Sequence, residues 1–148
     1  MKKTVLLAAA LLLASAAPAK KTLDHSDFDS WEKLTNGPVS GNGKWASFIV
    51  MPQEGDQTLT FYNTSNGSRI VVPRGYKPAF TADSRFAVAL IKPFYQDTRQ
   101  AKIKKKKNFD LPQDSLAFIN LSTGKVEKVG NVISYSLGKK GGDWVAWL

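Results

Sequence analysis

An internal repeat constrains the fold of this chain more than any other feature of its sequence. Three segments share one pattern, a polar turn followed by an aromatic residue that opens an apolar run: residues 41–48, 82–89 and 141–147. The opening aromatics are Trp45, Phe86 and Trp144, so the spacing is 41 residues and then 58. A period near 40 is typical of repeat architectures in which each unit is one small antiparallel sheet.

A second match fixes the register of the repeat. Residues 59–63 with the turn 65–67 align with residues 116–120 and the turn 122–124, both at a shift of 57. The longer spacing therefore holds an insertion at about residues 92–114. This insertion is polar and charged. It is interpreted first as a simple overhanging hairpin or loop, and it has room for a short helical stretch from Asp97 to Lys107.

Beyond Pro38 the chain reads as short strands separated by Gly, Asn and Ser turns. We expect strands over 44–51, 58–63, 69–72, 85–91, 115–121, 125–129, 132–137 and 143–148. With the repeat, this predicts an all-β fold, a partial β-propeller of about two to three antiparallel blades. Closed propellers need about four to eight blades. The blade count and the apolar run 143–148 suggest the N-terminal piece of a longer protein.

The first residues indicate export. Lys2 and Lys3 precede the apolar run 4–14, and small residues at 14–19 fit a cleavage site. The run is shorter than the roughly 20 apolar residues of a membrane-spanning helix. Residues 1–19 are therefore predicted to be a signal peptide, and the mature protein to be periplasmic or secreted. No cysteine is present, which excludes disulfides and thiolate metal sites.

Between the signal peptide and the repeat, residues 20–38 are expected to hold one short helix. Ser26 can cap it, with Asp29 as the capping-box partner. Phe28, Trp31 and Leu34 follow at helical spacing, and a Gly-Pro pair ends the run before residue 39. Residues 39–148 then form the incomplete propeller.

The net charge of +9 is concentrated in part on one stretch, Lys102 and residues 104–107. A lysine run without interleaved aromatics is typical of a solvated loop, and a polyanion-binding surface is the alternative.

The sequence offers no catalytic, cofactor-binding or metal-binding residue. His25 lies between Asp24 and Ser26, but a hydrolase triad is assembled from residues that are separate in sequence, so we do not expect His25 to be catalytic. No G-x-S-x-G elbow occurs. Asp83 and Asp143 hold matching places in the repeat, which favours a turn-capping role.

The recurring aromatics are expected to pack in the core rather than to form a platform for sugars or peptides. These residues are Trp45, Phe86, Trp144 and Trp147.

Several segments together resemble bacterial exported peptidases of the prolyl oligopeptidase family. They are residues 23–26 leading to Trp31, the turn 40–45, Gly75-Tyr76, residues 83–86, and residues 91–101 with their lysines and the following Leu111-Pro112. The resemblance covers nearly all of the mature chain, and the insertion is its most specific part.

In such peptidases an N-terminal propeller precedes a C-terminal α/β-hydrolase domain that holds the catalytic serine, aspartate and histidine. The resemblance implies that this chain restricts access of peptide substrates to a catalytic domain outside this sequence. Two other functions remain open: a stand-alone envelope β-repeat module that binds a partner through residues 94–107, and a polyanion-binding module that uses the lysines.

Overall fold

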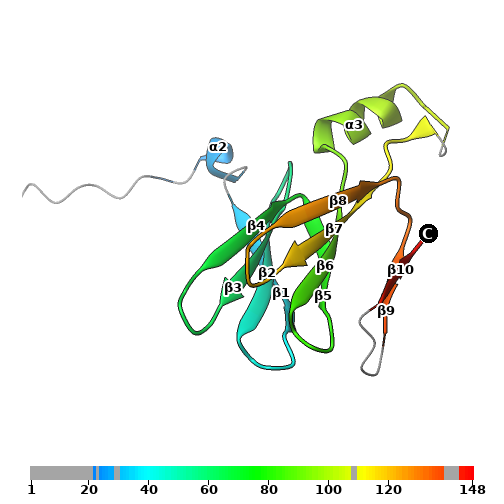
Figure 1. Cartoon of the computed structure of the whole chain (residues 1–148). Coiled ribbons are helices and arrows are strands. Elements are labelled where there is room, and N and C mark those ends of the chain that lie inside the picture. The colour runs from blue at the N-terminus through cyan, green and yellow to red at the C-terminus, as the bar shows by residue number, and fades with distance from the viewer. Residues whose placement is uncertain (1–21, 23, 29–30, 108–109, 139–143) are drawn as a thin grey trace, which may run out of the picture.

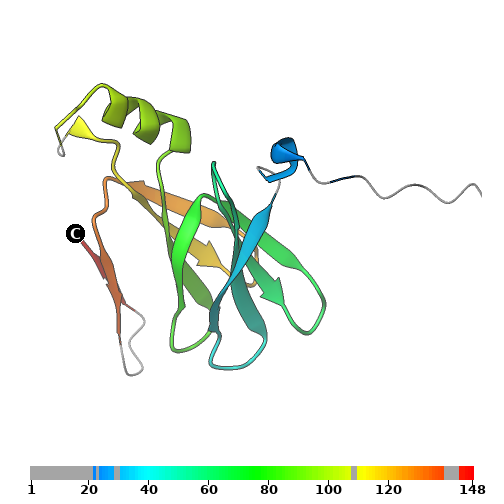
Figure 2. The same cartoon turned by 180° about the vertical axis from the view of Figure 1, so that it is seen from behind.

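The computed structural model describes residues 22, 24–28, 31–107, 110–138 and 144–148. It is an all-β structure of two four-stranded antiparallel sheets and a two-stranded ribbon, with two helices at the periphery (Figures 1 and 2). The predicted all-β class is confirmed, and the described sheets form an open stack.

Each four-stranded sheet is a meander in which neighbouring strands follow one another in the chain. The first sheet comprises β1 (Glu32–Val39), β2 (Trp45–Pro52), β3 (Thr58–Asn63) and β4 (Arg69–Pro73). The second comprises β5 (Gly75–Phe80), β6 (Phe86–Ile91), β7 (Ser115–Asn120) and β8 (Val126–Gly130). The ribbon pairs β9 (Tyr135–Leu137) with β10 (Val145–Trp147), and the helices are α2 (His25–Phe28) and α3 (Tyr95–Ile103).

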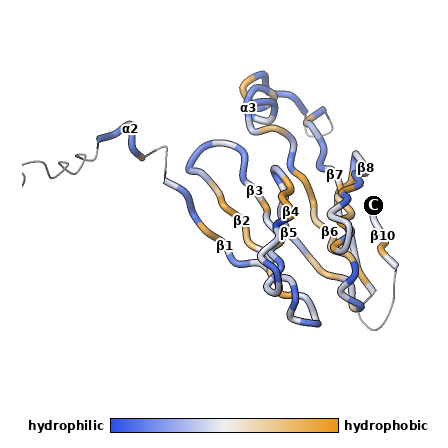
Figure 3. The backbone as a smooth tube through the Cα atoms, turned by 60° about the vertical axis from the view of Figure 1, so that its left-hand side comes forward, coloured by the Kyte–Doolittle hydropathy of each residue, from blue (hydrophilic) through white to orange (hydrophobic). Residues whose placement is uncertain are grey.

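The second sheet lies between the first sheet and the ribbon. One face of it packs on the first sheet in a core that includes Ile49, Leu59 and Phe61. The other face packs on the ribbon around Val88 and Leu90. Hydrophobic residues accordingly run along the strands, with hydrophilic residues in α2 and in much of α3 (Figure 3).

This layering explains the two burial patterns. β2 alternates buried Trp45, Ser47 and Ile49 with less buried neighbours, since one of its faces is covered. β6 is buried on both faces from residue 87 to Ile91, as expected for a strand with a layer on each side.

β5 reaches the second sheet by crossing over the first. Gly75 at its start lies against β3, where an added Cβ would come within 2.7 Å of the Leu59 Cβ. Farther along, Pro78 lies beside Gly37 of β1. The glycine thus permits the close approach with which the chain leaves one sheet and enters the next.

The described residues agree with the predicted repeat, and residues 141–143 of its third segment lie outside the described part of the chain. Trp45 and Phe86 are the first residues of β2 and β6, and Trp144 directly precedes β10. The second match, 59–63 with 116–120, lies in β3 and β7, the strands that follow β2 and β6 in their sheets. Within the insertion, the helical stretch considered over Asp97 to Lys107 is observed as α3 over Tyr95–Ile103, so it starts two residues earlier and ends before the lysine run 104–107.

Two strands differ from expectation. The helix predicted to include Trp31 and Leu34 is limited to His25–Phe28, and Glu32–Val39 is a strand, because pairing with β2 satisfies its backbone along its length. The expected propeller segment 39–148 therefore begins at the last residue of β1, a strand that already belongs to the first sheet.

β5 was not expected either. Its sequence lacks alternation, and its pairing with β6 is irregular between Tyr76 and Ala79, where Lys77 has a φ of 46°.

The predicted signal peptide 1–19 lies outside the described residues. No described helix has the length and apolar character needed to cross a membrane.

Candidate functional site

The two ends of the sheet stack differ in character. At one end, the turn end, short polar turns join β1 to β2, β3 to β4, β5 to β6 and β7 to β8 (Figure 1). At the opposite end, the insertion end, lie the loop 53–57, Arg74 and the insertion 92–114, which includes α3 (Figure 1).

Two equivalent hydroxyls close the turns that precede the opening aromatics. The Ser40 hydroxyl accepts a hydrogen bond from the Trp45 backbone N–H (3.0 Å). Forty-one residues later the Thr81 hydroxyl accepts from the Phe86 backbone N–H (3.1 Å). Both side chains are buried, so these groups serve the turns of the repeat.

Asp83 has the turn role that its place in the repeat predicted. Its Oδ1 accepts from the Thr81 hydroxyl (2.6 Å) and from the Arg85 backbone N–H (3.1 Å), and its Oδ2 forms an ion pair with the Arg85 side chain. The Thr81 hydrogen bond, followed by those of Arg85, lowers the pKa of Asp83 to about 2. Asn42 occupies the equivalent position and accepts from the Lys44 backbone N–H (3.0 Å). Asp143 lies outside the described residues.

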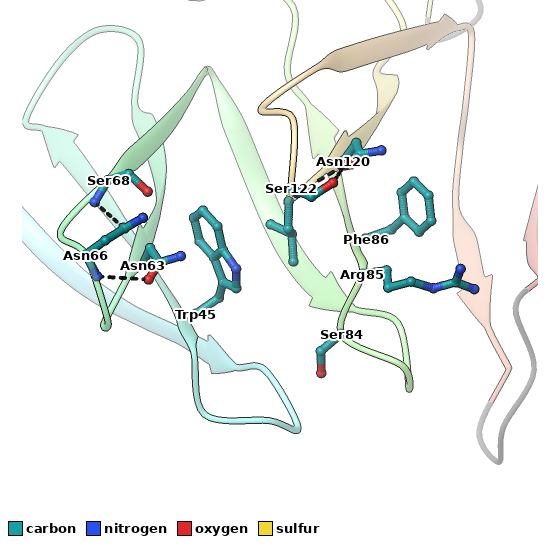
Figure 4. A pocket seen from close by; sticks show the side chains of 10 residues that line it. Trp45, Asn63, Asn66, Ser68, Ser84, Arg85, Phe86, Asn120 and Ser122 are labelled. Atoms are coloured by element: carbon teal, nitrogen blue, oxygen red, sulfur yellow. Dashed lines mark hydrogen bonds between the residues drawn. The ribbon is translucent and has the colours of Figure 1, made fainter.

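A pocket of about 510 Å³ opens between the two sheets at the turn end. In Figure 4, Trp45 lies between the turn that carries Asn63 and Asn66 and the second sheet. The Asn63 Oδ1 accepts from the backbone of residues 65 and 66, and the Asn120 Oδ1 accepts from residues 122 and 123. Because both amide oxygens already accept hydrogen bonds within their own turns, we attribute this pocket to the repeated turns and not to a ligand site.

At the insertion end, the loop 53–57 anchors α3. The Asp56 Oδ1 accepts a hydrogen bond from the Tyr95 backbone N–H (2.9 Å), and Glu54 forms an ion pair with Arg99 at 3.5 Å. Phe94 precedes the helix and makes no capping hydrogen bond with its own side chain. A carboxylate from a distant loop therefore replaces the usual N-cap.

Arg74 is held in an unusual conformation between the two sheets. Its φ is 63°, a region that non-glycine residues rarely adopt. Its backbone N–H donates to the Gln57 carbonyl (2.7 Å), and its carbonyl accepts from the Lys92 N–H (3.0 Å). These two bonds fix the backbone, and the guanidinium lies 3.6 Å from the centre of the Phe94 ring.

Gln57, Arg74 and Lys92 line a second pocket, of about 350 Å³. Its charged members are Asp56, Arg74, Lys92 and Asp114. Tyrosine, proline and leucine side chains form the remaining walls: Tyr76, Tyr95, Pro93, Leu111 and Pro112. Apolar walls with a few convergent polar groups are typical of small-ligand sites, so this pocket is the candidate functional site.

Hydrogen bonds order the polar groups of this pocket. Buried Gln57 donates from Nε2 to the Gly75 carbonyl (2.6 Å), which aims its Oε1 at the Lys92 ammonium (3.0 Å). The Tyr76 hydroxyl donates to an Asp114 carboxylate oxygen. Burial, reinforced by this bond to Asp114, raises the pKa of Tyr76, so the phenol stays protonated.

Sequence reasoning did not identify this pocket. It did set apart the insertion, which contributes Lys92, Tyr95 and Asp114. Gln57 and Arg74 come from the first half of the chain, and no local pattern links them to residues 92–114.

The described contacts of His25 are local ones. The Asp24 Oδ1 accepts from the His25 backbone N–H (2.6 Å), and the imidazole packs against Phe28 with ring centres 5.5 Å apart. The side chain of Ser26 lies outside the described part of the chain. Within the described residues, no three His, Asp or Glu side chains gather as metal ligands would.

The predicted core role of the aromatics holds for Trp45, which is 7% exposed. It is wrong for Phe86, Trp144 and Trp147, which are 39%, 56% and 50% exposed. The physical reason is the layering, because the ribbon covers only part of the second sheet and its own outer face is uncovered in the described structure. The lysines of the insertion are exposed: Lys102 is in the last turn of α3, and Lys104 to Lys107 follow the helix.

No protein-family model matches this chain, and no curated protein matches it in sequence. Two solved structures are similar in fold. One is an acylaminoacyl peptidase in complex with Z-Gly-Gly-Phe-chloromethyl ketone, with a TM-score of 0.53 and 14% identity over 77% of this chain and 16% of that chain. The other is the acylaminoacyl peptidase of Pyrococcus horikoshii, with a TM-score of 0.54 and 13% identity over 79% of this chain and 17% of that chain.

This chain therefore spans about a sixth of the length of each peptidase chain that it resembles. At 13–14% identity the similarity is one of fold. It agrees with the family resemblance of the sequence, and the chain is thus similar in fold to part of the acylaminoacyl peptidases.

Proposed function

We propose that this chain is the N-terminal propeller segment of an exported serine peptidase, and that it controls which peptides reach a catalytic domain outside this sequence. The observation that carries the proposal is the fold similarity to two acylaminoacyl peptidases. The family resemblance of residues 91–101 supports it independently.

The repeating orientation of the opening aromatics supports a propeller. Trp45 is on the face of β2 that packs against the second sheet, and Phe86 shares the face of β6 with Val88 and Leu90, toward the ribbon. Trp144 alternates with Val145, which packs on the second sheet, so it faces the other way. In each layer the opening aromatic points toward the next layer, and further blades would continue this order.

The outer face of the first sheet supports the same proposal. Three apolar residues lie on the face of this sheet opposite the core: exposed Leu34 and Val71, and half-buried Phe48. The strand register places them there, because Leu34 pairs with Val50 and Phe48 pairs with Thr60. A closed propeller would cover this face with its last blade, because each blade packs face to face with two neighbours.

Two measurements test the identity of the protein. In the coding sequence after residue 148, the proposal requires a G-x-S-x-G segment followed by an aspartate and then a histidine; a stop codon there would exclude it. N-terminal sequencing of the mature protein tests export, because cleavage after Ala19 leaves Lys20 as the first residue. An N-terminus that retains Lys2 would contradict export through a cleaved signal peptide.

The gating role needs its own experiment on the whole peptidase. We expect a short peptide to be cleaved, and the same segment to resist cleavage when it forms an exposed loop of a folded protein. Equal rates for the two substrates would leave the peptidase assignment intact and contradict gating.

A further inference from the structure

We propose that the pocket at the insertion end binds the free carboxylate of a short peptide, with Arg74 and Lys92 as the carboxylate-binding residues. The inference is independent of the proposed peptidase activity, because it concerns binding by this chain alone.

The first argument is that both cations have donors left for a ligand. In the described part of the chain, no carboxylate lies within ion-pair distance of Arg74 or Lys92. The two carboxylates in the same pocket already have partners: Asp56 accepts from the Tyr95 N–H, and Asp114 accepts from the Tyr76 hydroxyl.

The second argument is that the cations are held in place. The Arg74 guanidinium carbon lies 3.6 Å from the centre of the Phe94 ring. This contact restrains the side chain, and the N–H groups of a guanidinium can bind a carboxylate in a bidentate manner. The Lys92 ammonium donates one hydrogen bond to Gln57, and an ammonium has three donors. Because the Lys92 N–H is bonded to the Arg74 carbonyl, the two residues are fixed side by side.

The third argument concerns the rest of the ligand. The apolar walls formed by Pro93, Leu111 and Pro112 adjoin these cations in a space of about 350 Å³. A small anion such as acetate would leave most of this space unused, whereas the last residues of a peptide would place an apolar side chain against it. The strained backbone of Arg74 fits a site that is built in advance of binding.

The test compares two peptides on the intact chain. A tetrapeptide Ala-Ala-Ala-Leu with a free C-terminus and the same peptide as its C-terminal amide are titrated into the isotope-labelled protein, and amide shifts are followed by NMR. We expect the free acid to shift the amides of residues 74, 76 and 92, with an affinity on the order of millimolar typical of a small ligand. The amide should bind at least about tenfold more weakly, since it lacks the charge-assisted hydrogen bonds.

Arg74→Gln keeps the positive φ and removes the guanidinium, and it should weaken binding of the free acid at least about tenfold. The matched control is Arg69→Gln, because Arg69 is at the other end of β4, is exposed, and also lies over an aromatic ring, that of Tyr62. It should leave binding unchanged. Any of three results would overturn the proposal: equal binding of acid and amide, equal loss in both variants, or binding of acetate as tight as that of the peptide.

Discussion

The Asp56 carboxylate accepts the hydrogen bond of the Tyr95 backbone N–H at 2.9 Å, although the two residues are 39 positions apart. This contact places α3 over the end of the first sheet, and with it the wall of the candidate pocket that comes from the insertion. The negative charge also complements the positive end of the helix dipole.

Replacing Asp56 by Ala should therefore loosen the first turn of α3. We expect a loss of about 1 kcal/mol in the free energy of unfolding, the usual cost of an N-cap. Amide hydrogen exchange at residues 95–98 should accelerate, because these N–H groups belong to the start of the helix. Asp97→Asn is the control, since it removes a carboxylate from the same turn without removing this cap. Equal exchange rates in the two variants would mean that Asp56 does not anchor the helix.

Gly75→Ala should destabilise the protein by about 1–3 kcal/mol through overpacking. The added Cβ would lie 2.7 Å from the Leu59 Cβ and 3.0 Å from the Val72 carbonyl oxygen, so β5 could no longer cross at this point. Gly130→Ala is the matched control, because nothing lies within 4 Å of its added Cβ. Chemical denaturation of both variants measures the difference, and similar midpoints would contradict the close approach of β5 to β3.

The repeated turn hydroxyls should have similar energetic effects. Ser40→Ala and Thr81→Val each leave a backbone N–H, that of Trp45 or Phe86, without its side-chain acceptor. We expect each variant to lose about 1–2 kcal/mol in the free energy of unfolding. Ser122→Ala, at an exposed turn, should cost less than either. If neither substitution changes the free energy of unfolding, the two equivalent hydrogen bonds do not stabilise the protein.

Asp83 should make stability depend on pH in acid. Its pKa in the folded protein is about 2, below its ordinary value of 3.8. A lowered pKa means that the ionised form contributes stability, which is present above the ordinary value and is lost as the pH falls through about 2. The stability difference between the protein and Asp83→Asn should therefore shrink between pH 4 and pH 2. An Asp83 titration midpoint near 3.8, followed by NMR of its carboxyl carbon, would contradict the Thr81 and Arg85 contacts.

The sequence predicted the parts of the fold that depend on local pattern. The repeat located β2, β6 and β10, and turn chemistry located the ends of most other strands. It also assigned Asp83 correctly to a turn, because an aspartate in the turn before a strand accepts hydrogen bonds from nearby backbone amides.

The missed elements depend on contacts that are distant in sequence. Phe28, Trp31 and Leu34 are at helical spacing, and this pattern continues into the segment Glu32–Val39, which is a strand because it pairs with β2. The candidate pocket was missed for the same reason. Gln57, Arg74 and Lys92 have no common motif, and they meet because β5 crosses the first sheet and β6 returns beside it.

Labelling of the native protein with a fluorophosphonate probe tests the central claim most directly. The protein would be isolated from its source with an antibody raised against this chain, and the 148-residue chain would be labelled in parallel. We predict that the native protein is longer than 148 residues and is labelled at a serine beyond residue 148, while the chain alone is not labelled. A native protein that ends at Leu148 and carries no label, or a label on a serine within this chain, would contradict the account.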